Sequence, residues 1–401
     1  MTVDGAIRGL TAFALAAVSG FVLTIDVFTN AVHDARMAAM LILLVGANSL
    51  LRPRLWLFPE LYLYLGFLAY SALTLLWTQN LLLATNISLA MLNFTLIMVL
   101  FSQLMVSHEV RPALAGVLAG VLSGCALFDL ITHFPLVYPY GMSYNTVAGM
   151  ELFALVMVVT FGCHLRSRLL TLLLALVVWV HIVATTSIKT NLGIIIALFV
   201  VAVLNVRGSV KLLLRGAIPL AILIGGITYA VLSNPTLIAG IERGATRVSA
   251  GASLLLARED DASNTSVGLS VRENWKNLGI RGWAENPVFG HGAEAFRADF
   301  GITSHSTPID LLYNTGLIGI GLFYGIFAAM LWRWYHDRDP RRRGLRAIML
   351  GITCCYLFIS ASGLVYYDAF LPAFVGIAAG LHKRRTEEVL EVPALELPAP
   401  T

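Results

Sequence analysis

Hydrophobic positions along this chain form long continuous runs, and short polar connections separate one run from the next. Runs of about 16–25 residues can cross the hydrocarbon core of a bilayer as an α-helix, which needs roughly 20 residues. This pattern predicts an all-α polytopic membrane protein with about 12 transmembrane helices. The predicted spans cover residues 9–27, 36–51, 55–77, 81–106, 113–134, 145–164, 169–186, 190–206, 212–232, 307–333, 345–367 and 369–381.

A long polar segment between residues 233 and 306 interrupts the apolar runs and divides the chain. A connection of this length is expected to contain helices of its own. Ser270 followed by Glu273 has the spacing of a capping box, which predicts a helix from Val271 to about Trp283. The predicted organisation is nine transmembrane helices in 1–232, an extramembrane loop in 233–306, three transmembrane helices in 307–381 and a disordered cytoplasmic tail in 382–401.

Composition and charge support the membrane assignment and orient the chain. Hydrophobic residues make up 58% of the chain and charged residues 12%, whereas soluble domains carry roughly 25% charged residues. A soluble globular protein is therefore excluded. Lys and Arg concentrate in alternate connections, such as Arg166 with Arg168 and the run from Arg333 to Arg346. By the positive-inside rule, both termini are cytoplasmic and the loop 233–306 lies on the extracytoplasmic side.

The sequence contains no pattern typical of a metal or nucleotide site. The four cysteines all fall in or at the ends of apolar runs, so neither a disulfide framework nor a Cys-based metal site is indicated. The histidines lack metal-ligand spacing, and the chain has no Walker-type loop and no D-x-D motif in the extracytoplasmic loop. We therefore expect no metal and no cofactor.

His305 stands directly before a predicted helix start, with Thr307 as N-cap, Pro308 at the first helical position and Asp310 at the third. The free N–H groups of a helix N-terminus favour anions. A neutral imidazole at this place can act as a general base on a hydroxyl. The alternative is a surface histidine at a loop–helix junction.

Lys189 opens the eighth predicted span, on the extracytoplasmic side, where it breaks the charge alternation. A cation at a helix N-terminus opposes the helix dipole at a cost of about 0.3–1 kcal/mol. The lysine and the helix terminus together indicate an anion site, for instance for a phosphate. The alternative is a lysine whose ammonium group extends along the helix to the membrane surface.

Arg272 and Lys276 lie one turn apart on the predicted loop helix. An arginine can hold a diphosphate through two parallel hydrogen bonds. The alternative is an exposed helix arginine. The predicted spans also contain Asp129, Glu151 and His181, and ionisable groups in lipid often have a function. For these three, structural pairing between helices is the competing explanation.

Several short motifs resemble the O-antigen ligase and O-antigen polymerase superfamily. They are Arg272-Glu-Asn-Trp275, Glu285-Asn-Pro-Val-Phe-Gly-His-Gly292, Ser304-His-Ser306, Tyr313-Asn-Thr-Gly-Leu-Ile-Gly319, Ser187-Ile-Lys189 and Asn145-Thr-Val-Ala148. The motifs cover roughly residues 145–320, and the topology with a large loop after the ninth span extends the likeness to the whole chain. Lys189 stands where many ligases have Arg, which is more similar to the exopolysaccharide and capsule polymerases.

This resemblance implies an all-helical C-type glycosyltransferase fold in the bacterial inner membrane, with its active site facing the periplasm. It implies metal-independent, inverting transfer of a glycan from undecaprenyl diphosphate to an acceptor hydroxyl on a glycan or on lipid A–core. Lys189 and Arg272, with Lys276 beside them, would hold the diphosphate, and His305 would orient or deprotonate the acceptor. Asn145, Glu151, Asp129 and His181 would contact the acceptor or serve the structure. Membrane lipids are the other expected partners, and nucleic acid is not one.

Other functions remain open at this point. A twelve-span secondary transporter would fit the topology, but the two halves show no internal repeat, and the cationic residues gather at one face rather than at the midplane. A lipid-linked oligosaccharide flippase would need a large cationic cavity, whereas the spans contain few Lys or Arg. Polymerase, ligase and transfer to a protein hydroxyl are not distinguished by the sequence.

Overall fold

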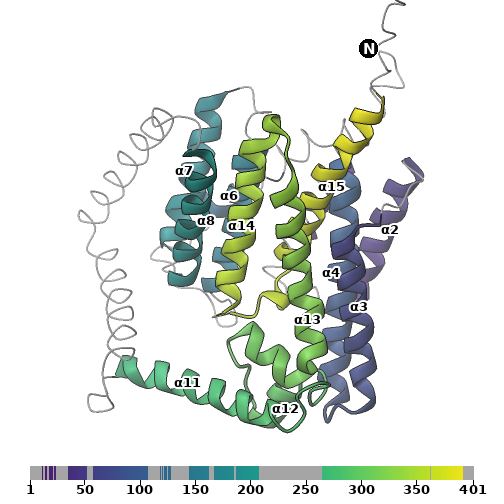
Figure 1. Cartoon of the computed structure of the whole chain (residues 1–401), viewed down its shortest axis with the longest axis vertical. Coiled ribbons are helices and arrows are strands. Elements are labelled where there is room, and N and C mark those ends of the chain that lie inside the picture. Colours follow the sequence, from purple (N-terminus) through teal and green to yellow (C-terminus); the bar gives the residue numbers. More distant parts are fainter. Residues whose placement is uncertain are drawn as a thin grey trace, which may run out of the picture.

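The computed structural model describes residues 35–51, 57–106, 144–161, 167–184, 187–206, 264–361 and 363–391, with isolated positions in 11–23 and 118–127. Within these ranges every regular element is a helix (Figure 1). The predicted all-α class is therefore confirmed for the described part of the chain.

The longer helices follow the apolar runs. They are α2 (Ala35–Leu51), α3 (Pro59–Leu73), α4 (Leu81–Val106), α6 (Tyr144–Phe161), α7 (Arg168–Ala184), α8 (Ile188–Val206), α11 (Asn264–Trp283), α13 (Thr307–His336), α14 (Arg343–Ser360) and α15 (Phe370–Glu391). The short ones are α12 (Ala295–Phe300) and the 3-10 turns η2 (Thr74–Leu76), η4 (Pro340–Arg342) and η5 (Val365–Tyr367).

The helices have the length and composition of a multi-pass membrane protein. Among the described residues, four helical stretches are long and apolar enough to cross a bilayer: Pro59–Leu76, Leu81–Val106, Thr307–His336 and Pro340–Ser360. Five shorter apolar helices accompany them: Ala35–Ser49, Val147–Phe161, Leu169–Ile182, Lys189–Leu204 and Phe370–Lys383. The predicted spans 9–27, 113–134 and 212–232 fall wholly or largely outside the described residues.

Three predicted boundaries are wrong. The loop helix α11 begins at Asn264 rather than at Val271, because Ser263 and Asn264 are equally good capping types and Ser270 is accepted inside the helix. Helix α14 ends at Ser360 rather than near 367, because Gly363 follows and the chain turns into η5.

The third error concerns the C-terminal tail, predicted to be disordered from residue 382. Helix α15 continues to Glu391, because the residues after His382 are mostly good helix formers and the first proline comes only at Pro393.

The described helices pack as two neighbouring groups (Figure 1). In one group α4 packs against α2, α3 and α15, and α13 packs against α3. In the other group α6 packs against α7 and α14 packs against α8. Contacts of α14 with α13 and of α6 with α15 join the two groups.

Close contacts between helices use glycine, as expected where van der Waals packing in lipid drives association. Gly376 and Gly380 of α15, spaced as a GxxxG pair, rest on the backbone of α4 at Met98 and Ser102. A β-carbon at Gly380 would lie 2.6 Å from the Ser102 carbonyl oxygen. Any larger residue would therefore push α15 away from α4.

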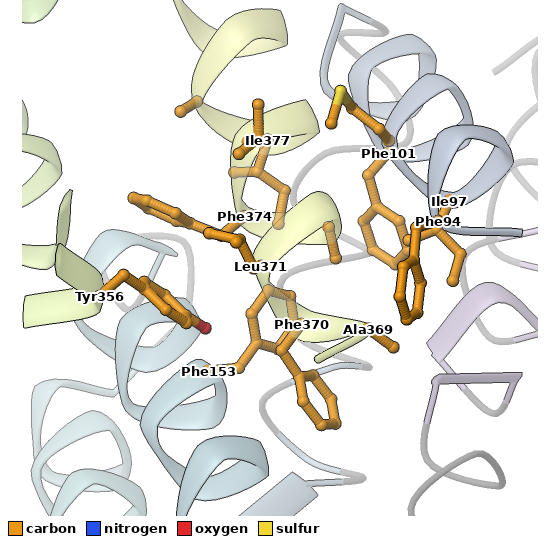
Figure 2. Packing of buried hydrophobic residues seen from close by; sticks show 14 of the residues in the cluster. Phe94, Ile97, Phe101, Phe153, Tyr356, Ala369, Phe370, Leu371, Phe374 and Ile377 are labelled. Carbon is orange, nitrogen blue, oxygen red and sulfur yellow. The ribbon is translucent and has the colours of Figure 1, made fainter. Parts of the chain in front are cut away.

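The first half of α15 lies at the centre of the apolar core (Figure 2). The Phe370 ring lies 5.4 Å from Phe153 of α6. The Phe374 ring stacks on Tyr356 of α14 at 5.6 Å. Phe101 of α4 meets Phe153 edge to face at 6.4 Å. The aromatic side chains of α15 thus contact those of α6 and α14, and Phe153 extends the cluster to α4.

Polar contacts at one end of the bundle fix the helix directions. Arg333, near the end of α13, forms an ion pair with Glu60 at the start of α3. Arg343, at the start of α14, donates to the Leu204 carbonyl near the end of α8 at 3.0 Å. We call this the basic end. The opposite end, where α3 finishes, α8 and α13 begin, and α11 and α12 lie across the bundle (Figure 1), is called the loop end.

Candidate functional site

Helix α13 is broken at Gly316, close to the loop end. Gly316 has φ 60° and ψ −160°, values that only glycine adopts readily. A break inside an apolar helix leaves backbone groups without helical partners, and these must be satisfied within the protein. The local sequence Thr-Gly-Leu-Ile-Gly gives no sign of this break, and the sequence prediction was a continuous span.

Residues Asn286–Gly292, here called the docking segment, fill the break. The His291 and Gly292 N–H groups donate to the carbonyl oxygens of Tyr313 and Asn314 at 2.9 and 2.8 Å. In return, Leu317 N donates to Pro287 O at 3.0 Å, so groups on both sides of the break are paired with the segment. Gly290 and Gly292, at φ 71° and 105°, allow the chain to turn tightly here.

The docking segment is also attached to the end of α3. Ala293, the residue directly after the segment, donates its N–H to Thr74 Oγ1 at 3.0 Å. Thr78 Oγ1 donates to the Ala293 carbonyl at 2.8 Å, and Tyr70 Oη to the Phe289 carbonyl at 2.9 Å. The segment and Ala293 therefore join α3 to α13 at the loop end.

A buried carboxylate organises the turn before α13. Asp310 is 2% exposed and accepts hydrogen bonds from Ser304 N at 3.1 Å and Asn314 Nδ2 at 2.9 Å. The Tyr366 hydroxyl of η5 donates to the same carboxylate. Burial and the nearby Asp310 and Glu294 carboxylates raise the pKa of Tyr366, so this hydroxyl keeps its proton as a donor.

His305 is displayed by this turn. Its backbone has φ 56°, in the left-handed region that is uncommon for residues other than glycine. Ser304 Oγ donates to the Ser306 carbonyl at 2.9 Å and closes the turn from within. Ser306, rather than Thr307, is the N-cap of α13, one residue before the predicted position. The half-buried imidazole ring lies 5.6 Å from the Trp275 ring of α11.

The contact with Trp275 brings α11 to the His305 turn. Arg272 is three residues before Trp275 in α11, and its side chain lies outside the described residues. Lys276 is the half-buried neighbour of Trp275. The Arg272 backbone thus lies about one helical turn from the residue that contacts His305, and the position of its guanidinium group stays a prediction.

Lys189 reaches the same turn from the first residues of α8. Its Nζ lies so close to Gly363 that a β-carbon at Gly363 would collide with it. The Gly363 carbonyl accepts from Thr307 Oγ1 at 2.6 Å and from Thr307 N at 3.1 Å. Thr307 is two residues after His305. A single junction of Lys189, Gly363 and Thr307 therefore places the lysine ammonium group next to the His305 turn.

Glu294 is a second buried carboxyl group at the loop end. It is 4% exposed, and its backbone has φ 60°. Burial, together with the charge of Asp310, raises its pKa to about 7, while Arg297, at 3.9 Å, lowers the pKa by a smaller amount. Near neutral pH this carboxyl group can therefore hold or release a proton.

Sequence reasoning identified Asp310 only as a helix-start residue and did not single out Glu294 or Tyr366. The position of Asp310 in the first turn of α13 was the available signal. Glu294 and Tyr366 stand in stretches without a motif, and only the fold brings them to Asp310.

The other predicted site residues fall on α6 and α7 or outside the described part of the chain. Glu151 of α6 and His181 of α7 are both fully buried, and His181 Nδ1 lies 3.2 Å from Glu151 Oε1. This pair fits the structural alternative, a polar contact between two apolar helices. Asn145 is in the first turn of α6, with its side chain outside the described residues, and Asp129 lies outside them entirely.

Within the described ranges, no group of three or more His, Cys, Asp and Glu residues is arranged to hold a metal ion. No protein-family model and no curated protein matches this chain.

Proposed function

We propose that this chain is a membrane glycosyltransferase that moves a glycan from a polyprenyl diphosphate to an acceptor hydroxyl on the extracytoplasmic face. The observation that supports the proposal is the junction of Lys189, Gly363 and Thr307, which joins a cationic side chain to the His305 turn. The loop end also receives α11 with Arg272 and Lys276. A lipid-linked substrate can reach such a site because it lies where the helices end.

The diphosphate is the leaving group in this proposal. As the bond between the anomeric carbon and the diphosphate oxygen breaks, the electron pair remains on the diphosphate, and fixed cations stabilise the developing charge. Lys189 offers an ammonium group at the first turn of α8, where helix N–H groups also favour anions. Arg272 would add a bidentate contact.

His305 receives the proton in this proposal. The acceptor oxygen attacks the anomeric carbon from the side opposite the diphosphate, which inverts the configuration, and its proton passes to the neutral imidazole. Asp310 orients the histidine through Ser304 rather than by contact with the substrate. In this proposal His305 reacts with the substrate, and the buried Asp310 carboxylate holds the turn that carries His305.

The broken helix does not favour the transporter alternative. In transporters, discontinuous helices present backbone groups to substrate and ions near the membrane midplane. Here the break lies near one end of α13, and the docking segment takes up its carbonyl and N–H groups. The break therefore serves to attach the loop.

The test supplies purified protein in lipid nanodiscs with a defined undecaprenyl-diphosphate oligosaccharide and with each acceptor class. We expect transfer by the wild type and at least a 100-fold loss of rate in Lys189→Met and His305→Ala. Lys189→Arg should retain part of the activity because it keeps the charge. A ladder of products indicates a polymerase, and a single product linked to the lipid A–core acceptor indicates a ligase.

The matched control is Arg338→Met, which removes an exposed charge near the basic end and should leave the rate unchanged. If Lys189→Met and His305→Ala both transfer at the wild-type rate, or if the wild type transfers to no acceptor, the proposal is wrong.

A further inference from the structure

An open groove of about 580 Å³ lies at the loop end, between the end of α3 and the docking segment. Its volume falls in the range of roughly 300–1,000 Å³ typical of small-ligand sites. Three aromatic residues line it, Tyr70 and Trp77 on one side and Phe289 on the other. Phe289 is 59% exposed and Trp77 37%, so ring surface is available to a ligand.

Polar side chains complete the lining. Gln79 and Asn286 contribute exposed amides, which both donate and accept hydrogen bonds. His291 also lines the groove, with its Nε2 paired to the Gly282 carbonyl at 2.8 Å. Among the described residues that line the groove, none carries a carboxylate, an ammonium or a guanidinium group. A phosphate-bearing lipid headgroup would find no cation here, although cations are what phosphates usually bind.

We infer that this groove binds a neutral saccharide. A pyranose ring has flat faces of C–H groups, which pack against aromatic rings, and a rim of hydroxyl groups, which pair with amides. The groove offers both kinds of surface, and its lack of charge selects an uncharged, polyhydroxylated ligand over an anionic one.

The groove is connected to the His305 turn through the docking segment. The Phe289 carbonyl accepts from Tyr70, while the backbone of the same segment pairs with α13 at Tyr313 and Asn314. Asn314 in turn donates to Asp310, which holds Ser304. That the saccharide is part of a glycan in the transfer reaction rests on the proposed function, whereas saccharide binding itself does not.

Photo-crosslinking identifies the occupant. A benzophenone amino acid replaces Gln79, an exposed residue outside any helix, in protein reconstituted into phosphatidylethanolamine–phosphatidylglycerol nanodiscs. The probes are the oligosaccharide cleaved from the carrier of the transfer assay, a neutral hexasaccharide and a hexauronate. We expect the mass of the adduct to show the neutral hexasaccharide, or the cleaved oligosaccharide if its sugars are uncharged. We expect no adduct with the hexauronate. An adduct with phospholipid alone, or with hexauronate in preference to neutral sugar, overturns the inference.

Equilibrium binding of the same probes then tests the groove residues. We expect Phe289→Ala and Trp77→Ala each to weaken binding of the neutral probe at least tenfold, and Trp77→Phe to restore most of it. Trp332→Ala, which removes a 70% exposed ring near the basic end, is the control and should not change binding. Equal binding by wild type and Phe289→Ala overturns the inference, since Phe289 is too exposed to be required for folding. Saccharide binding without any transfer would support the groove while contradicting the proposed function.

Discussion

At the scale of single residues, Glu294 combines a buried carboxyl group with a left-handed backbone, two unfavourable features at one position. Burial and Asp310 raise the pKa of Glu294 from 4.5 to about 7. The free energy of unfolding therefore depends on pH through this group. Between pH 4.5 and pH 7 the folded protein holds a proton on Glu294 that the unfolded chain has lost. The contribution of this residue to stability is therefore full below pH 4.5 and is lost as pH rises through 7.

We predict that Glu294→Gln removes this dependence, because glutamine resembles the protonated acid at every pH. The wild type should lose thermal stability between pH 5 and pH 8, whereas the variant should not. Above pH 7 the variant should be more stable by roughly 3 kcal/mol, from about 1.4 kcal/mol per pKa unit. Thermal unfolding in detergent at both pH values measures this. Parallel curves for the two proteins would show that another group carries the pH dependence.

The residues of the candidate site differ in how far sequence could reveal them. His305 and Lys189 are polar residues beside helix starts in apolar surroundings, and this local signal was sufficient to single them out. Their meeting at Gly363 was not readable, because Gly363 follows α14 and lies far from both in sequence. The pairing of Glu60 with Arg333 was not readable either, since the two residues lie 273 positions apart in the chain.

At the scale of elements, Gly316 decides whether α13 can break and accept the docking segment. Its φ and ψ exclude other residues, and a β-carbon there would collide with the Val288 carbonyl oxygen. Helix limits were largely readable from hydrophobic runs, and α4 coincides with the predicted span 81–106. The break was not readable, because its cause is the partner segment rather than the sequence of the helix itself.

We predict that Gly316→Ala destabilises the protein by more than about 3 kcal/mol, through backbone strain and the collision together. Gly321→Ala is the matched control in the same helix, with an ordinary backbone and open space around its Cα. It should be neutral or stabilising by up to about 1 kcal/mol. Chemical unfolding in mixed micelles compares the two. Equal stability of the two variants would contradict the assigned role of the break.

At the scale of the whole molecule, two attachments hold α13 against α3. The docking segment joins them at the loop end, and the ion pair of Arg333 with Glu60 joins them at the basic end. The Glu60 side chain is 1% exposed and that of Arg333 10%, so neither charge can be solvated if its partner is removed. Hydropathy predicted the helices, but the choice of neighbours depends on such contacts between distant residues.

A double-mutant cycle measures this attachment. We expect Glu60→Gln and Arg333→Met each to cost about 3–5 kcal/mol, because each leaves a buried charge without its partner. The double variant should recover much of the loss, giving a coupling of more than about 1 kcal/mol. Additive losses in the double variant would mean that the two side chains do not depend on each other.

The broken helix also constrains how the protein is made. The docking segment precedes α13 in the chain, so it is synthesised before the helix with which it pairs. The stretch after the break, Leu317–His336, is long enough to enter the translocon as a complete helix of about 20 residues. The partner of the break is therefore already made when α13 folds, and the freed backbone groups can pair with it as soon as the helix forms.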